Sequence, residues 1–369
     1  MKTKLLTLCL ALTLGLSLLV VSAQAAPVAM ASRQGFRVDG KAVTAEVYNV
    51  DGSNYFKLRD IAMLLKDTPS CFSVNYDEAT RTISVATGVT YLPDNSELKT
   101  GRDKSASCTP SNQSLMIDGR NVKLQAYNFG GNNFFRLRDL GEELSFYVGY
   151  DQEHNLALLD SAYYIRHTDL SEGLPVQLYY EVPVFKGESE GLRKINRAFD
   201  ELEQNFISKK APDVRAMTRE SMNGGYAPTK EEPYMDRNDA RVWQHGDLVS
   251  TSISYDWYMG GVADYGSSCY NFNAKTGKQL FLNDILDMPE SKIKEAIVSA
   301  LVANYPGVEE TGVMETPMDA IRAMNIRDID FIVKEDGTIE VIFDKYEIAA
   351  GYAGMFAIPL KDLPTKPLN

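Results

Sequence analysis

Residues 54–65 have the sequence NYFKLRDIAMLL, and residues 133–144 repeat it as NFFRLRDLGEEL, 79 positions later. The same offset aligns FRVDGK near the start of the first copy with LMIDGR near the start of the second. Both copies then continue into apolar-alternating stretches, FSVNYDEATRTISV (72–85) and FYVGYDQEHNLALL (146–159). The chain therefore contains an internal repeat, and this repeat decides the fold of its first half.

Each copy predicts the same order of elements. Asp-Gly pairs at 39–40 and 118–119 mark hairpin turns between short alternating runs. The aromatic pair of each phrase predicts a strand, and the leucines that follow at helical spacing predict a short helix. We therefore expect two β-rich units, each roughly β-β-helix-β-β, at 34–93 and 113–160, with a polar connector at 94–112. Whether the two units share one sheet or stand apart is left open by the pattern.

Beyond residue 162 the repeat ends and the pattern changes. We expect a domain at 162–369 of the α+β class, with an antiparallel sheet. Strands are predicted at 174–185, 247–259 and 267–274, a hairpin at 331–343, helices at 190–207 and 289–304, a further helix start near Thr316, and a loop-rich insertion at 208–240. On the helix at 190–207, Leu192, Ile195, Phe199, Leu202 and Phe206 share one face.

The N-terminus has the features of a secretory signal peptide spanning residues 1–25. Lys2 and Lys4 precede an uncharged apolar run at 5–21, and Ala23 and Ala25 have the spacing of a cleavage site. The alternative is an uncleaved anchor, because the run is close to the minimum length that spans a bilayer. We expect a secreted, extracellular chain that is associated with the cell wall and has no transmembrane segment after cleavage.

The charge of the chain limits its partners. It carries 50 acidic and 38 basic side chains, a formal net charge of −12. Such a chain repels phosphate backbones, so we expect no nucleic-acid partner. The charge suits a cationic protein, but solubility alone is the more common explanation for such a charge. The oligomeric state is left open.

Cysteine and catalytic motifs are sparse. Cys71 and Cys108 lie in the same region and are a possible disulfide, which would leave Cys269 free; three incidental cysteines are the alternative. The chain has no Cys-x-x-Cys, no His-Glu-x-x-His, no Gly-x-Ser-x-Gly and no glycine-rich phosphate loop. We therefore expect no catalytic residues, no metal and no cofactor.

The best candidate for a binding surface is the aromatic stretch YDWYMGGVADY (255–265). We single out Tyr255, Trp257, Tyr258, Asp264 and Tyr265, because aromatic side chains beside a glycine turn often form a recognition surface for protein or sugar. Alternation places Tyr255 and Trp257 on one face of the strand and Tyr258 on the other. The alternative is that one of these faces belongs to the core.

The repeated phrase also carries a family resemblance. YNVDGSNYFKLRDIAMLL and AYNFGGNNFFRLRDLGEEL resemble the stalk domain called copper amine oxidase N-terminal-like, which is common in exported proteins of Gram-positive bacteria. The resemblance covers 34–160 as a tandem pair. It implies a non-catalytic appendage, with neither copper nor amine oxidation.

The second half resembles another exported module. The stretches YEVPVFKGESEGLRKINRAFDELEQNF (180–206) and FIVKEDGTIEVIFDKYEIAAGYAGMFAIPL (331–360) are similar to the extracellular region of lysozyme-sensing anti-sigma factors. They are also similar to the non-catalytic front part of peptidoglycan deacetylases. The chain departs from both, since no histidine follows the Gly260-Gly261 turn and there is neither a cytoplasmic anti-sigma segment nor a deacetylase domain.

These observations predict a secreted, cell-envelope-associated binding protein without catalysis. Its stalk repeats would present a C-terminal module that binds a protein, with a lysozyme-like protein as the specific candidate, or wall glycan. The alternatives are an envelope hydrolase with an unrecognised site and a purely structural wall protein.

Overall fold

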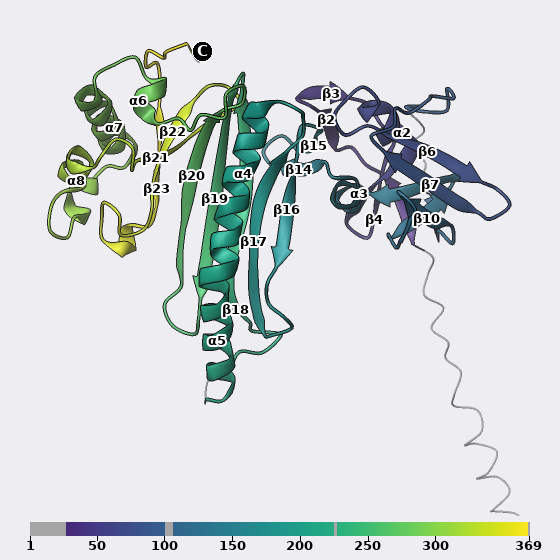
Figure 1. The fold of residues 1–369 in the computed structure, drawn as a ribbon, viewed down its shortest axis with the longest axis horizontal. Coiled ribbons are helices and arrows are strands. Elements are labelled where there is room, and N and C mark those ends of the chain that lie inside the picture. The colour runs from purple at the N-terminus through teal and green to yellow at the C-terminus, as the bar shows by residue number, and fades with distance from the viewer. Residues whose placement is uncertain (1–26, 100–105, 225–226, 368–369) are drawn as a thin grey trace, which may run out of the picture.

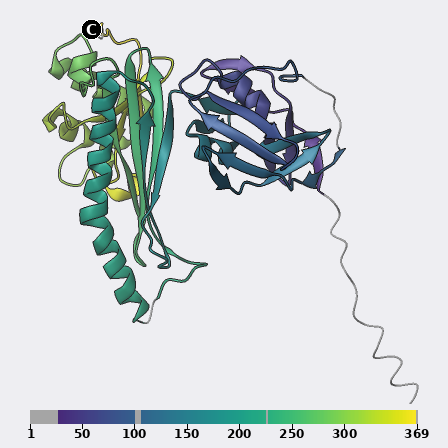
Figure 2. The same ribbon diagram turned by 45° about the vertical axis from the view of Figure 1, so that its right-hand side comes forward.

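The computed structural model describes residues 27–99, 106–224 and 227–367, and the predicted signal peptide lies outside them. The described chain forms two bodies that lie side by side (Figure 1 and Figure 2). One contains both repeats and the other contains the rest of the chain. The predicted α+β class is confirmed, because separate β-sheets are combined with helices in both bodies. Within the described ranges no helix is long and apolar enough to cross a bilayer.

One seven-stranded sheet joins the two repeat copies. Its strands are β1 (Val28–Ala31), β4 (Val47–Val50), β5 (Ser53–Lys57), β8 (Ala106–Ser107), β9 (Thr109–Pro110), β12 (Ala126–Phe129) and β13 (Asn132–Arg136). Their order is β8-β1-β4-β5-β13-β12-β9, so the copies meet at the β5–β13 pair. There Phe56 lies opposite Phe135, its own counterpart in the repeat, and Tyr55 lies opposite Arg136. An approximate two-fold axis therefore passes between Phe56 and Phe135.

The remaining hairpins are exchanged between the copies. They are β2 (Gly35–Val38) with β3 (Lys41–Val43), β6 (Phe72–Asp77) with β7 (Thr82–Thr87), β10 (Ser114–Ile117) with β11 (Arg120–Val122), and β14 (Tyr147–Asp151) with β15 (Leu156–Asp160). They form two four-stranded sheets, β11-β10-β7-β6 and β14-β15-β2-β3. In each, a strand of one copy pairs in parallel with a strand of the other. The two copies are thus one interlocked unit.

The repeated phrase supplies the centre of this unit. After each central strand comes a short helix, α2 (Leu58–Leu65) or α3 (Leu137–Leu144). Phe56, Leu65 and Phe72 of the first copy share one buried core with Phe135 and Leu140 of the second. Burial of this joint apolar surface is the main source of stability for both copies.

The predicted connector at 94–112 also makes specific contacts with the repeat copies. The backbone N–H of Leu98 donates to the buried carboxylate of Asp60 at 3.0 Å. The Lys57 ammonium group donates to the carbonyl of Ser96 at 2.7 Å. These contacts hold the start of the connector over the N-terminal end of α2, and β8 and β9 near its other end extend the seven-stranded sheet.

The second body contains a five-stranded sheet in the order β16-β17-β18-β19-β20. Its strands are β16 (Tyr163–Asp169), β17 (Val176–Phe185), β18 (Tyr234–His245), β19 (Leu248–Tyr258) and β20 (Asp264–Asn273). One long helix crosses this sheet (Figure 1). It comprises α4 (Glu190–Asn205), a π-helical turn (Phe206–Lys210) and α5 (Ala211–Met222). The predicted apolar face is confirmed at Ile195 and Phe199, which are fully buried.

A three-stranded sheet completes the second body. Its strands are β21 (Asp330–Val333), β22 (Ile339–Phe343) and β23 (Phe356–Leu360), accompanied by the helices α6 (Leu282–Ile285), α7 (Glu290–Asn304), α8 (Pro317–Ala323) and the 3-10 turns Val308–Thr311 and Gly351–Ala353. A buried network joins the two sheets: the Ser250 hydroxyl donates to the Asn271 side-chain carbonyl, whose amide donates to the carbonyl of Phe331. The backbone N–H of Val333 donates to the Ser250 hydroxyl.

The predicted loop-rich insertion at 208–240 is wrong. This segment contains α5 and the first half of β18. The buried positions of β18 are Tyr234, Asp236, Asn238 and Ala240, so two of the four are polar. A strand with polar residues on its buried face does not show the apolar alternation from which strands are predicted. The strand β16 was also absent from the prediction.

Candidate functional site

The five predicted binding residues lie on the hairpin of β19 and β20, but the structure divides them between different environments. Tyr258 packs edge-on against Tyr234, with ring centres 6.3 Å apart, and belongs to the core below the long helix. Trp257 lies opposite Asp264 across the hairpin, and both are half-buried. Tyr265 is 40% exposed. The five residues therefore do not form one surface.

Tyr255 belongs to a polar cluster beneath the long helix. Lys210, from the π-helical turn, places its ammonium group 5.9 Å from the centre of the Tyr255 ring and 3.1 Å from the carboxylate of Asp236. Asp236 is fully buried, so this ion pair anchors the helix to the sheet. Burial, with Asp264 and Asp344 nearby, raises the pKa of Tyr255 to about 12. The core interpretation is therefore the better one for Tyr255 and Tyr258.

Tyr265 belongs to a different and exposed group, which we call the tyrosine patch: Tyr265, Lys345, Tyr346 and Tyr352. Lys345 lies over the rings of Tyr265 and Tyr346, at 5.7 and 4.9 Å from their centres. Tyr346 is 64% exposed and Tyr352 is 79% exposed. Lys345 also donates to the carbonyl of Ala263 in the β19–β20 turn, which ties the 344–354 loop to this hairpin.

The loop that carries the patch is held in an unusual conformation. Tyr346 has a φ of +71°, in the left-handed region that side chains other than those of glycine and asparagine rarely adopt. Its ring lies against Gly351, where an added Cβ would be only 2.1 Å from the ring. A bulky residue at positive φ costs of the order of 1–3 kcal/mol, and such strain is concentrated at functional sites. The loop therefore keeps Tyr346 exposed despite this local cost in conformational free energy.

Carboxyl groups gather along the edge of β20 beside the patch. Asp344 accepts two hydrogen bonds from the backbone N–H of Ser267, at 2.9 and 3.1 Å. Gly266 leaves room for it, because a Cβ there would lie 2.2 Å from the Asp344 carboxylate. Burial raises the pKa of Asp330 to about 7, and also raises the pKa of Asp344 and of Glu347.

The described residues contain no group of three His, Cys, Asp or Glu side chains placed to hold a metal ion. The ammonium group of Lys186 lies 2.9 Å from the Ser70 hydroxyl, as in a serine–lysine dyad. However, Ser70 is 3% exposed and donates its proton to the carbonyl of Ser161 at 2.8 Å, so a substrate has no access to it. This pair instead links the two bodies, since Ser70 belongs to one and Lys186 to the other.

The possible disulfide is not formed. Cys71, Cys108 and Cys269 are all free thiols. Cys108 is buried behind β1, where its thiol donates to the carbonyl of Pro27, and Cys71 is half-buried close to the junction with the second body. Burial raises the pKa of Cys108 and of Cys269, which keeps both thiols protonated and unreactive.

The sequence prediction missed three of the four patch residues. Lys345, Tyr346 and Tyr352 lie in the stretch KYEIAAGY between β22 and β23, far from the β19–β20 hairpin in sequence. Two tyrosines around a glycine, just after a hairpin strand, are the one local signal for them.

Comparison with solved structures found partial structural similarity to proteins of the DUF3298 family. No family model and no curated protein matches the chain. A member of the DUF3298 family from Bacteroides fragilis is 15% identical, with a TM-score of 0.38, over 60% of this chain and 92% of that one. A DUF3298 family protein from Pseudomonas aeruginosa is 16% identical, with a TM-score of 0.33, over 56% of this chain and 92% of that one.

Proposed function

We propose that this chain is a secreted, cell-envelope-associated binding protein without catalysis. In this proposal the interlocked repeats act as a stalk, and the C-terminal body binds a macromolecular ligand through the tyrosine patch. The observation that carries the proposal is the patch itself. Three tyrosines with ring faces or edges open to solvent supply large contact area at little conformational cost, as in many recognition surfaces.

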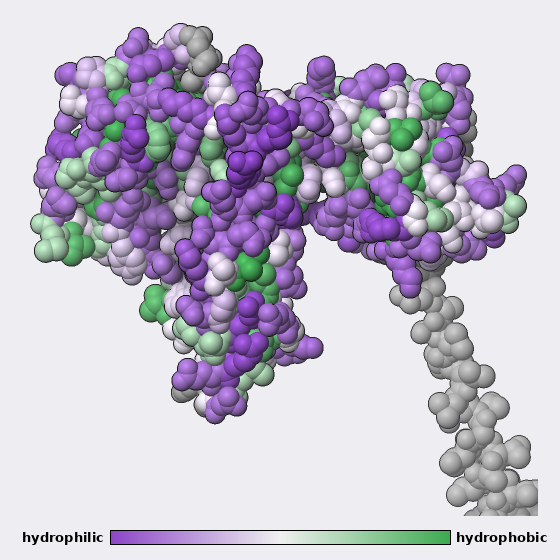
Figure 3. Space-filling model, viewed as in Figure 1, coloured by the Kyte–Doolittle hydropathy of each residue, from purple (hydrophilic) through white to green (hydrophobic). Residues whose placement is uncertain are grey.

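The ligand that we favour is a cationic protein. The chain has a net charge of −12, Asp264 directly precedes Tyr265 of the patch, and Figure 3 shows that most of the visible face is hydrophilic. A negative surface accelerates association with a positive partner. The resemblance of the C-terminal half to the extracellular region of lysozyme-sensing anti-sigma factors makes lysozyme the first probe.

Wall glycan is the second candidate, because exposed tyrosine rings also stack against sugars. The two candidates differ in their response to salt. Attraction between charged surfaces is screened within about 8–10 Å at physiological ionic strength, whereas stacking of a neutral sugar on a ring is not.

The experiment is a binding titration of the chain from residue 27 onward, against hen lysozyme and against insoluble peptidoglycan, each at low and at high salt. Saturable lysozyme binding that weakens with salt supports the favoured ligand. Salt-independent retention on peptidoglycan supports the glycan. If neither probe is bound at low salt, the binding proposal fails for both ligands.

A further inference from the structure

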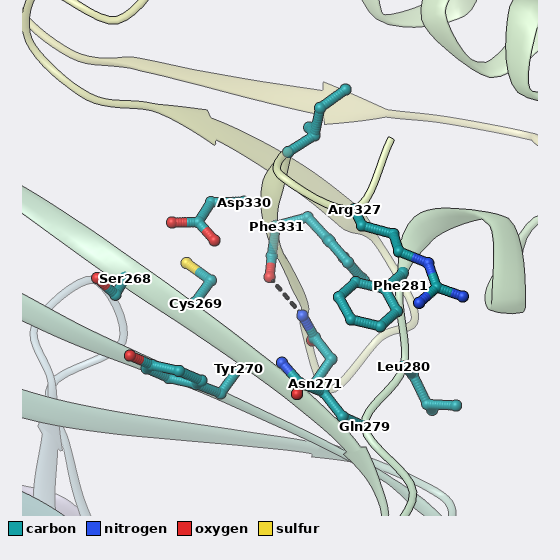
Figure 4. A pocket seen from close by; sticks show the side chains of 11 residues that line it. Ser268, Cys269, Tyr270, Asn271, Gln279, Leu280, Phe281, Arg327, Asp330 and Phe331 are labelled. Atoms are coloured by element: carbon teal, nitrogen blue, oxygen red, sulfur yellow. Dashed lines mark hydrogen bonds between the residues drawn. The ribbon is translucent and has the colours of Figure 1, made fainter. Parts of the chain in front are cut away.

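A second site lies along the outer edge of β20 and is lined by none of the four residues of the tyrosine patch. It is a cavity of about 240 Å³ lined by both charged and polar side chains. Figure 4 shows Asp330 and Cys269 at one end, Arg327 and Phe281 at the other, and Asn271 between them. Ligand pockets for drug-sized molecules usually measure about 300–1,000 Å³, so this cavity suits a smaller molecule, of the size of an amino acid or a dipeptide.

Arg327 places a cation at one end of the cavity, and Asp284 lies close enough to interact with its charge. Its guanidinium group lies over the ring of Phe281, with 4.9 Å between the central carbon and the ring centre. Within 27–99, 106–224 and 227–367, no carboxylate lies within ion-pair distance of it. Stacking on the ring restricts the orientation of the guanidinium plane while its N–H donors stay available. A planar, pre-oriented guanidinium group is well suited to a carboxylate.

Asp330 offers the opposite charge at the other end. Its carboxyl accepts from the backbone N–H of Cys269, and no lysine or arginine of the described chain forms an ion pair with it. Its pKa is raised to about 7 by burial, with Glu347 and Asp344 contributing. A bound cation would relieve this desolvated negative charge, so the end of the cavity around Asp330 favours an ammonium group.

The backbone of β20 between the two ends is already engaged by the protein itself. β20 is the last strand of its sheet. On its outer side, the chain that follows β20 pairs with it at the Phe272–Gln279 bridge. Further along β20, the Asp344 carboxylate accepts a hydrogen bond from the backbone N–H of Ser267. Between these two points the N–H of Cys269 donates to Asp330, and the Asn271 amide donates to the carbonyl of Phe331 in β21, so recognition at this cavity falls to side chains.

We propose that this cavity binds a small zwitterion of dipeptide size, with its carboxylate on Arg327 and its ammonium group on Asp330. A cysteine-based reaction is not part of the proposal, because burial and Asp330 keep the Cys269 thiol protonated. The site is independent of the tyrosine patch, so its failure would leave the proposed macromolecular binding untouched.

The test is isothermal titration of the chain from residue 27 onward with L-alanyl-L-alanine, its N-acetyl form and its C-terminal amide. We expect the free dipeptide to bind and each blocked form to bind at least about tenfold more weakly, a loss of one charge-assisted contact. Arg327→Gln should weaken binding of the free dipeptide by a similar factor but leave binding of the amide unchanged. Arg197→Gln, which removes an exposed arginine on α4, is the matched control and should have no effect.

Two results would overturn the proposal. One is the absence of saturable binding of the free dipeptide at millimolar concentration. The other is equal affinity of the free and amidated dipeptides for the unaltered chain, a comparison that needs no variant to fold.

Discussion

Replacing Ser250 with alanine should destabilise the C-terminal body more than any other removal of a single serine hydroxyl in its sheet. Ser250 is fully buried, and its hydroxyl donates to Asn271 at 2.5 Å and accepts from the backbone N–H of Val333 at 2.9 Å. The substitution leaves a buried acceptor and a buried donor without these partners. Each such loss costs about 1–3 kcal/mol, so we expect a decrease of about 2–6 kcal/mol in the free energy of unfolding.

The assay can be confined to the relevant body. The chain has two tryptophans, Trp243 and Trp257, and both lie in the five-stranded sheet. Urea denaturation followed by tryptophan fluorescence therefore reports on the C-terminal body. With a slope of about 2 kcal/mol/M, the expected loss lowers the midpoint by roughly 1–3 M.

Ser252→Ala is the matched control. Ser252 lies two residues along the same strand, on the same face, and is 5% exposed. Its hydroxyl is 3.5 Å from that of Ser254, too far for a strong hydrogen bond. We expect a loss below about 1 kcal/mol. Equal midpoints for the two variants would refute the conclusion that Ser250 joins the two sheets, and with it the rigid placement of Tyr265 beside the 344–354 loop.

Further predictions concern the repeats, pH and the cysteines. The isolated copies 34–93 and 113–160 should be unfolded by circular dichroism, whereas 27–160 should fold, because each four-stranded sheet needs strands of both copies. Between pH 5 and 8 the C-terminal body should lose stability as pH rises, because the Asp330 carboxyl has a raised folded-state pKa and stabilises the fold only while it is protonated. In the Asp330→Asn variant, the urea midpoint should depend less on pH over this range. Thiol titration of the denatured, unreduced chain from residue 27 should find three free thiols.

The sequence predicted the elements of the repeats well, because their turns and strands follow local rules. The Asp-Gly turns at 39–40 and 118–119 have positive φ at both residues, as hairpin turns of this type require. The exchange of hairpins could not be predicted from the sequence pattern, because a parallel strand pair between the copies has no local sequence signature. The pairing of Phe56 with Phe135 at the two-fold axis explains why the phrase is repeated at all.

In the C-terminal half, prediction failed where polar residues are buried. Asp236 and Asn238 hide the alternation of β18, and their partners, Lys210 and the backbone of Tyr179, are distant in sequence. The binding candidates failed for a related reason. Aromatic residues near a glycine turn occur both in cores and on surfaces, and only the position of the long helix decides that Tyr255 is covered and Tyr265 is open.

The central claim is that the tyrosine patch is the ligand-binding surface. Its direct test compares lysozyme and peptidoglycan binding by the unaltered chain with binding by a Tyr346→Asn, Tyr352→Ala double variant. Asparagine tolerates the positive φ of position 346, so the fold is preserved. Tyr150→Ala, which removes a tyrosine 52% exposed on the repeat body, is the control. The account predicts a loss of at least about thirtyfold for the double variant, as for recognition hot spots, and none for the control. Unchanged affinity of the double variant for a ligand that the unaltered chain binds would contradict it.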